Sequence, residues 1–222
     1  MPRSFDFIAR PYRWLEYLSF GPMLERCRFY RLPQLAGARR PLVLGDGDGR
    51  FLARLLQENP AMHADAVDLS PAMLRILTTR AAKAAVEDRV TVQCADARDF
   101  TPAGSCDLVV THFFVDCFTT GELRTMASRI RPHLQPGARW IVSEFAIPSG
   151  WMKLPAGLIV NGLYAAFGIL TGLRTRRLPD YASVLAEAGL SLLDRRHWLA
   201  GLLVSELWQA RATSLTGAGS QR

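Results

Sequence analysis

The sequence predicts an α/β fold: a mostly parallel, seven-stranded sheet with helices on both faces and an antiparallel hairpin at its C-terminal end. Three observations support this. The chain has 222 residues, of which 49% are hydrophobic and 21% are charged, as in an ordinary globular domain. Residues 41–145 alternate short β-like runs with helix-like runs, the pattern of right-handed βαβ units. Two β-like runs then follow each other near the C-terminus without a helix between them.

Each element follows from a local signal. Apolar or alternating runs predict strands at residues 41–44, 63–68, 90–94, 106–111, 138–145, 190–198 and 202–210. Helical spacing predicts helices at residues 50–58, 71–81, 119–133 and 181–188. Ser70 before Pro71 is typical of a helix start, because the hydroxyl caps the helix and proline fits its first position. Thr119 and Glu122 have the spacing of a capping box, and Gly189 is typical of a helix end.

Charge and cysteine content exclude several classes of protein. The net charge is +7, with +5 in residues 1–41, +3 in residues 151–180 and −2 in residues 42–150. Nucleic-acid binding usually needs a denser, lysine-rich stripe, so we expect no nucleic-acid partner. The four cysteines have no C-x-x-C spacing and no ligand cluster is visible, so we expect neither a disulfide framework nor a metal site. No signal peptide is visible, and we expect a cytoplasmic protein.

The chain divides into two parts. We expect residues 1–40 to form an N-terminal helical lid segment, and residues 41–222 to form the ligand-binding domain with a helical insertion at 150–179. Within the insertion, residues 154–173 carry no charge and are long enough to span a membrane. Their glycine, proline, asparagine and threonine content opposes insertion, and a span would separate the last helix and strands from their sheet. A buried or lid-like helix is therefore expected.

A glycine-rich loop follows the first predicted strand. Gly45, Gly47 and Gly49 alternate with two aspartates and open a helix. Glycines let the backbone turn sharply and approach a ligand, and the helix N-terminus directs N–H groups towards it. Asp68 ends the second strand, 19 residues after Gly49, where a carboxylate can accept hydrogen bonds from both hydroxyls of a ribose. The sequence therefore predicts a nucleoside ligand at this edge of the sheet.

The loop favours one nucleoside over another. Arg50 stands where the dinucleotide fingerprint needs its third glycine. Asp46 and Asp48 disfavour a diphosphate and suit a ligand with a cationic amino or sulfonium group. The residues thus favour S-adenosylmethionine (SAM) over a nicotinamide dinucleotide, and a nicotinamide-dependent oxidoreductase is the weaker alternative.

On these residues the sequence resembles the class I SAM-dependent methyltransferases. Residues 42–49 are similar to their first motif, residues 67–74 to their second, residues 94–97 to their third, and residues 106–110 to their fourth strand. The resemblance implies a Rossmann-like methyltransferase fold for the whole sheet. Residues 5–12, 19–21 and 178–190 also look like the ubiquinone/menaquinone-biosynthesis methyltransferase group.

The resemblance also implies which residues bind SAM. It places Asp96 near the adenine amino group and a backbone N–H of the third motif on the adenine ring. Val43 stands where the family usually has an acid, so we expect a loop aspartate to meet the methionine amino group instead. The predicted cofactor-binding residues are Gly45, Asp46, Gly47, Gly49, Asp68, Leu69, Asp96, Ala97 and Thr111.

Methyl transfer from a sulfonium needs orientation and exclusion of water, with a base only if the acceptor must lose a proton. His112, Asp116 and Glu144 are the candidate bases, because they lie at or near the carboxyl ends of predicted strands. The alternatives are packing or helix capping for His112, helix capping for Asp116, and hydrogen bonding to the neighbouring backbone for Glu144. Residues 1–41 and 151–180 carry a surplus of positive charge, and Lys153, Arg174, Arg176 and Arg177 flank the uncharged stretch 154–173.

From this pattern we expect C- or O-methylation of a small, lipophilic acceptor, with a peripheral contact to an anionic membrane surface. The alternative is a buried helix with solvated arginines. A non-catalytic partner protein with the same fold is the alternative function.

Overall fold

The computed structural model describes residues 22–148, 150, 154, 157, 158, 162 and 178–211. The similarity at residues 5–12 and 19–21, and most of the insertion at 150–179, lie outside the described residues.

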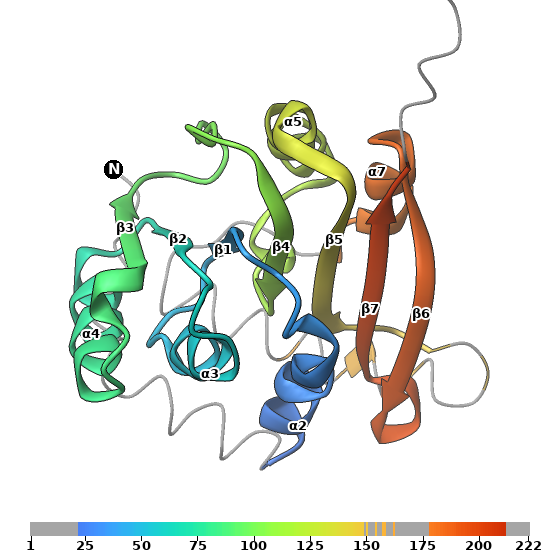
Figure 1. Cartoon of the computed structure of the whole chain (residues 1–222). Helices are drawn as coiled ribbons and strands as arrows, with labels where there is room; N and C mark the ends of the chain where they lie inside the picture. Colours follow the sequence, from blue (N-terminus) through green and yellow to red (C-terminus); the bar gives the residue numbers. More distant parts are fainter. Residues whose placement is uncertain are drawn as a thin grey trace, which may run out of the picture.

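The described chain forms one seven-stranded sheet in the order β3-β2-β1-β4-β5-β7-β6 (Figure 1). The first five strands in this order are parallel, whereas β7 pairs antiparallel with both β5 and β6. The predicted fold class is confirmed. The strands are β1 (Pro41–Leu44), β2 (Ala64–Asp68), β3 (Val90–Cys94), β4 (Cys106–His112), β5 (Leu134–Phe145), β6 (Leu190–Trp198) and β7 (Leu203–Ala210).

Helices cover both faces of this sheet. Helices α5 (Thr120–Ile130) and α7 (Tyr181–Glu187) pack on one face, around the buried Trp140 and Val142 of β5. The other face carries η2 (Leu32–Leu35), α3 (Arg50–Glu58) and α4 (Pro71–Lys83), which pack on the buried Val110 and Ile141. Helix α2 (Met23–Phe29) lies against β7 near the end of β5. Alternating residues of the central strands therefore belong to two separate hydrophobic cores, one on each face of the sheet.

Local signals set the helix starts. Ser70 Oγ accepts a hydrogen bond from Met73 N at 3.2 Å at the start of α4. Thr119 and Glu122 form the predicted capping box at the start of α5. The helix expected to reach residue 133 ends at Ile130 and continues as the short η5 (Arg131–His133), because Pro132 cannot donate to the helical ladder. The remaining short turns are η3 (Glu87–Arg89), η4 (Val115–Cys117) and η7 (Leu199–Gly201).

The strand order reverses between β1 and β4. The connections from β1 run outwards to β2 and β3, and the chain then returns to place β4 on the other side of β1. Their carboxyl ends lie side by side, with Leu44 level with Thr111. In open α/β sheets a crevice forms at such a switch point, and ligands bind there. The loops after β1, β2, β3 and β4 therefore define the candidate site.

A buried arginine, Arg31, binds the N-terminal part of the described chain to strands β6 and β7. Arg31 is 1% exposed and donates to Ser205 Oγ at 3.1 Å and to Ser205 O at 2.9 Å. Its Nη1 also pairs with Asp194 Oδ2 at 2.9 Å. A buried guanidinium with this many partners orders the surrounding backbone. Helix α2 is thereby fixed beside β6 and β7. That it forms part of a lid over the site stays a prediction.

Leu154 and Leu158 of the insertion are helical and are 79% and 75% exposed. No helix in the described part of the chain is long and apolar enough to cross a membrane.

Candidate functional site

The glycine-rich loop has the backbone that only glycine adopts readily. Gly45, Gly47 and Gly49 have φ values of +65°, +61° and +76°. A Cβ on Gly45 would lie 2.0 Å from the ring of Phe114, and a Cβ on Gly49 would lie 2.9 Å from the Cα of Leu77. Among the described residues, a Cβ on Gly47 would meet nothing within 4 Å. The loop therefore packs tightly at both ends and faces open space in the middle, where a ligand can approach the backbone.

The loop aspartates are used within the protein. Asp46 Oδ2 accepts a hydrogen bond from Leu52 N at 3.0 Å, which caps helix α3. Asp48 pairs with Arg50 and with Arg80, each at 2.9 Å. Sequence reasoning missed Arg80, which reaches the loop from α4. The expectation that a loop aspartate meets the methionine amino group stays a prediction, and in this geometry one Asp46 oxygen already has a partner.

Burial raises the pKa of the Asp46 carboxyl to about 7, and the nearby Asp48 adds to this effect, whereas the Leu52 hydrogen bond, Arg28 and Arg50 oppose it. Because the folded pKa lies above the unfolded value, the stability that Asp46 contributes is present at acidic pH and is lost as the pH rises towards 7.

Asp46→Asn should therefore melt at a higher temperature than the wild type at pH 8, and the difference should shrink towards pH 4. Asparagine keeps an oxygen for Leu52 N without the cost of a buried charge. Thermal melts across this pH range measure the difference, and a difference that does not change with pH would contradict the assignment.

Asp68 and Asp96 lie at neighbouring strand ends. Asp68 ends β2, and its Oδ1 accepts a hydrogen bond from Ser70 N at 2.8 Å. Asp96 follows β3, which pairs with β2 so that Asp68 and Cys94 are level. Ala95 N donates to Asp68 O at 3.1 Å and joins the two loops. The structure thus brings together the two carboxylates that were predicted from separate motifs.

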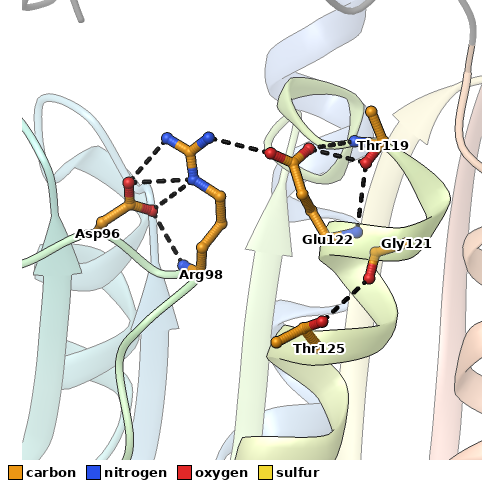
Figure 2. Close-up of polar contacts among 6 residues, drawn as sticks. All are labelled: Asp96, Arg98, Thr119, Gly121, Glu122 and Thr125. Carbon is orange, nitrogen blue, oxygen red and sulfur yellow. Dashed lines mark hydrogen bonds and ion pairs between the residues drawn. The ribbon is translucent and has the colours of Figure 1, made fainter. Parts of the chain in front are cut away.

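An arginine holds the Asp96 carboxylate. Arg98 Nε donates to Oδ1 of Asp96 at 2.9 Å, and Arg98 Nη2 donates to Oδ2 at 2.7 Å (Figure 2). These hydrogen bonds hold the pKa of Asp96 below its ordinary value, although burial opposes them. Arg98 Nη1 donates to Glu122 Oε1 of α5 at 3.0 Å. Sequence reasoning did not identify Arg98, although its position two residues after Asp96 allows such a pair.

The other predicted cofactor residues differ in exposure. Leu69 is 38% exposed beside Asp68, whereas Ala97 is buried against the core beneath α5. Thr111 is fully buried, and its hydroxyl donates to Ile141 O at 3.1 Å and accepts from Trp140 Nε1 at 3.2 Å. Thr111 therefore presents no exposed surface to a ligand in this structure, and its contact with the cofactor stays a prediction.

Two of the candidate bases lie together. Glu144 is fully buried in β5; its Oε2 accepts from Asp116 N at 3.3 Å and its Oε1 from Phe145 N at 2.9 Å. Burial raises the pKa of Glu144 well above its usual value, and the negative charge of Asp116 raises it further. Cys117 donates to Asp116 Oδ1 at 3.7 Å. Burial raises the pKa of Cys117 well above its ordinary value, and the carboxylates of Asp116, Glu144 and Asp68 contribute to the rise.

His112 lies on the opposite face of the sheet from Glu144. It is level with Ser143 in the ladder, so it faces α3, and its ring meets Phe51 edge-on at 4.4 Å between centroids. Both ring nitrogens are buried, and neither has a hydrogen-bond partner among the described residues. Burial lowers the pKa of His112 well below its ordinary value, and the charge of Arg28 lowers it further. The structure does not bring His112 together with the two carboxylates.

A metal centre is not apparent in the described ranges, where no group of three His, Cys, Asp or Glu side chains could hold an ion.

Part of the chain is similar to known methyltransferases in sequence. Residues 42–137 match the model of a methyltransferase domain. Over 161 residues the chain is 31% identical to the release factor glutamine methyltransferase of Cereibacter sphaeroides. This matched region covers 70% of this chain and 56% of the relative. Over 110 residues the chain is 36% identical to polyamine aminopropyltransferase 2 of Ralstonia nicotianae. This matched region covers 46% of this chain and 20% of the relative. The chain thus spans less than two thirds of the length of these relatives.

Solved structures show the same fold. An O-methyltransferase family protein from Burkholderia thailandensis aligns with a TM-score of 0.68 at 19% identity, over 94% of this chain and 59% of that one. The N-methyltransferase NodS from Bradyrhizobium japonicum, in complex with S-adenosylhomocysteine (SAH), aligns with a TM-score of 0.60 at 15% identity, over 84% and 87% of the two chains. Residues 42–137 thus resemble a methyltransferase domain, and the described chain has the Rossmann-like fold seen in these methyltransferase structures.

Proposed function

We propose that this protein transfers a methyl group from SAM to a small, lipophilic acceptor. The observation that carries the proposal is the arrangement at the carboxyl ends of β1, β2 and β3. A glycine loop with open space at Gly47 lies next to Asp68 and Asp96, two carboxylates on neighbouring strand ends. This arrangement fits a nucleoside better than it fits a dinucleotide, because Arg50 replaces the third glycine of the dinucleotide fingerprint.

The residues have separate tasks in this proposal. Asp68 accepts hydrogen bonds from the ribose hydroxyls, and Asp96 accepts one from the adenine amino group. The backbone at Gly47 lies against the methionine part of the ligand. When bound, SAM supplies a methyl group on a positively charged sulfur. The protein's own contribution is to orient the acceptor against that methyl group and to exclude water.

A proton acceptor is available if the acceptor molecule must lose a proton. Glu144 and Asp116 lie close together, and their repulsion favours one shared proton over two full charges. The ionised partner of this pair is the base that we propose for a hydroxyl or an acidic carbon. His112 is kept neutral by burial and lies on the other face, so it is the weaker candidate.

The acceptor class rests on the composition of the insertion and on its exposed leucines. Leu154 and Leu158 are four residues apart, and each is at least 75% exposed. Arg174, Arg176 and Arg177 follow the uncharged stretch. A segment whose sequence combines exposed apolar residues with basic ones suits the surface of an anionic membrane, from which a lipophilic acceptor can be taken. We include such a peripheral contact, and membership of the quinone-biosynthesis group of methyltransferases, in the proposal.

The membrane contact can be measured by sedimentation with vesicles. Binding should increase with the anionic lipid content and fall with salt. Leu154→Ser with Leu158→Ser should weaken it by roughly a hundredfold or more, since each buried leucine contributes about 1.5–3 kcal/mol. The control is Leu193→Ser, because Leu193 is also exposed but lies on β6. Absence of sedimentation at low salt would exclude the contact.

The activity is tested with methyl-labelled SAM. Calorimetry with SAH should first give a one-to-one binding isotherm. The protein is then incubated with labelled SAM and a cell extract that is afterwards separated into aqueous and organic phases. Label in the organic phase supports a lipophilic acceptor, and label in the aqueous phase only would overturn that part of the proposal. Binding of SAH without any transfer would favour the non-catalytic partner protein, and failure to bind SAH would overturn the proposal as a whole.

A further inference from the structure

The loop after β3 is joined to helix α5 by a chain of charged hydrogen bonds. Asp96 in the loop, Arg98 two residues later and Glu122 in the first turn of α5 form one continuous network (Figure 2). Glu122 Oε2 in turn accepts hydrogen bonds from the backbone N–H and the hydroxyl of Thr119, each at 2.8 Å. The network therefore connects the strand end at one edge of the candidate site to the N-cap of a helix on the other side of the switch point.

The geometry restrains the Asp96 carboxylate on several sides. Besides the two guanidinium hydrogen bonds described above, Arg98 N donates to Oδ1 at 3.0 Å and Arg98 Nε also contacts Oδ2 at 3.0 Å. A planar guanidinium in this fork fixes both the position and the tilt of a carboxylate, which an ammonium group cannot do. The remaining guanidinium nitrogen is anchored to Glu122, so Arg98 itself cannot swing freely.

The network is too exposed to contribute much stability. The side chains of Asp96, Arg98 and Glu122 are 27%, 41% and 36% exposed, and ion pairs of this kind add little to the free energy of unfolding. The same loop is also held by other contacts. Phe100 is buried in the core beneath α5, and Arg129 donates to Asp99 O at 3.2 Å. The fold of the loop therefore does not depend on Arg98, whereas the orientation of the Asp96 carboxylate does.

We propose that Arg98 is a positioning residue that determines specificity for the base of the ligand. It holds Asp96 ionised and correctly tilted, so that the carboxylate can only accept, and the base edge that faces it must donate. An amino group on the base is then favoured and a carbonyl oxygen is rejected. This inference rests on the proposed binding of SAM, because it assigns a task to the residue behind Asp96.

The test compares two ligands with two variants. SAH carries an amino group on its base, and S-inosylhomocysteine, its deaminated analogue, carries an oxygen there. Calorimetry should show that Arg98→Gln weakens SAH binding roughly tenfold, since a preorganised carboxylate becomes mobile. The wild type should bind SAH more tightly than S-inosylhomocysteine. The dissociation constant of S-inosylhomocysteine divided by that of SAH should fall at least several-fold in this variant. Arg98→Lys should recover little of either effect, because lysine restores the charge but not the fork.

The matched control is Arg124→Gln. Arg124 lies on the same helix as Glu122 and forms a bidentate ion pair with Glu187, at 2.7 Å from Nε to Oε2, with both side chains 53% exposed. A merely structural loss of an ion pair at α5 would give the same melting temperature in both variants and leave the ligand ratio unchanged in both. An unchanged ratio or tighter SAH binding in Arg98→Gln would overturn the inference alone. Failure of the wild type to bind SAH would overturn the proposed function, and this inference with it.

Discussion

Asp68→Ala should weaken the binding of SAH by about 30- to 150-fold. Asp68 lies at the carboxyl end of β2, beside the glycine loop, where its carboxylate can accept hydrogen bonds from both ribose hydroxyls. Two charge-assisted hydrogen bonds lost at a partly buried site correspond to roughly 2–3 kcal/mol. Isothermal calorimetry with SAH measures this directly.

Two further variants separate ligand contact from loop structure. Asp68 Oδ1 also accepts the hydrogen bond of Ser70 N at the start of α4, so alanine removes a local contact as well. Asp68→Asn keeps an oxygen for that N–H and should still weaken binding, by roughly tenfold, because it removes the charge and one acceptor. Asp65→Ala, at an exposed position of the same strand, should leave the affinity unchanged. Unaltered affinity in Asp68→Ala would refute the assignment of the ribose site.

The elements could be predicted because their signals are local. The start of α4 depends on Ser70 and Pro71, and the start of α5 depends on Thr119 and Glu122, pairs separated by at most three residues. The alternation of strands and helices then restricts the topology, and the reversal of strand order between β1 and β4 follows the general rule for such sheets. For the same reason the glycine loop and Asp68 could be assigned to one edge of the sheet.

Side-chain partners could not be predicted in the same way. Asp48 pairs with Arg80, and Arg98 pairs with Glu122, at separations of 32 and 24 residues. Such pairs depend on how two elements pack, which no local pattern specifies. The face occupied by His112 likewise depends on the register between β4 and β5: His112 is level with Ser143, so Glu144 faces the other side. Once that register is known, alternation along the strand separates the candidate bases.

Alanine at Gly49 should lower the stability more than alanine at Gly47, whereas alanine at Gly47 should weaken SAH binding more than alanine at Gly49. Gly49 and Gly47 both have positive φ, so alanine costs about 1–2 kcal/mol of backbone strain at either position. A Cβ at Gly49 would also lie 2.7 Å from Leu77 Cγ and 2.9 Å from Leu77 Cα, and a backbone atom of α4 cannot move aside as a side chain can. Overpacking of this kind costs roughly another 1–3 kcal/mol.

Gly49→Ala should therefore lower the melting temperature by roughly 4–20 °C, at about 2–4 °C per kcal/mol for a chain of this size. Gly47→Ala should lower it by only about 2–8 °C, because its Cβ meets no described residue within 4 Å. The affinity for SAH should show the reverse order: the methyl group of Gly47→Ala enters the open space where we place the methionine part of the ligand. Thermal melts and calorimetry on both variants give the two orders. If Gly47→Ala binds SAH as tightly as the wild type, the ligand does not approach the loop at Gly47.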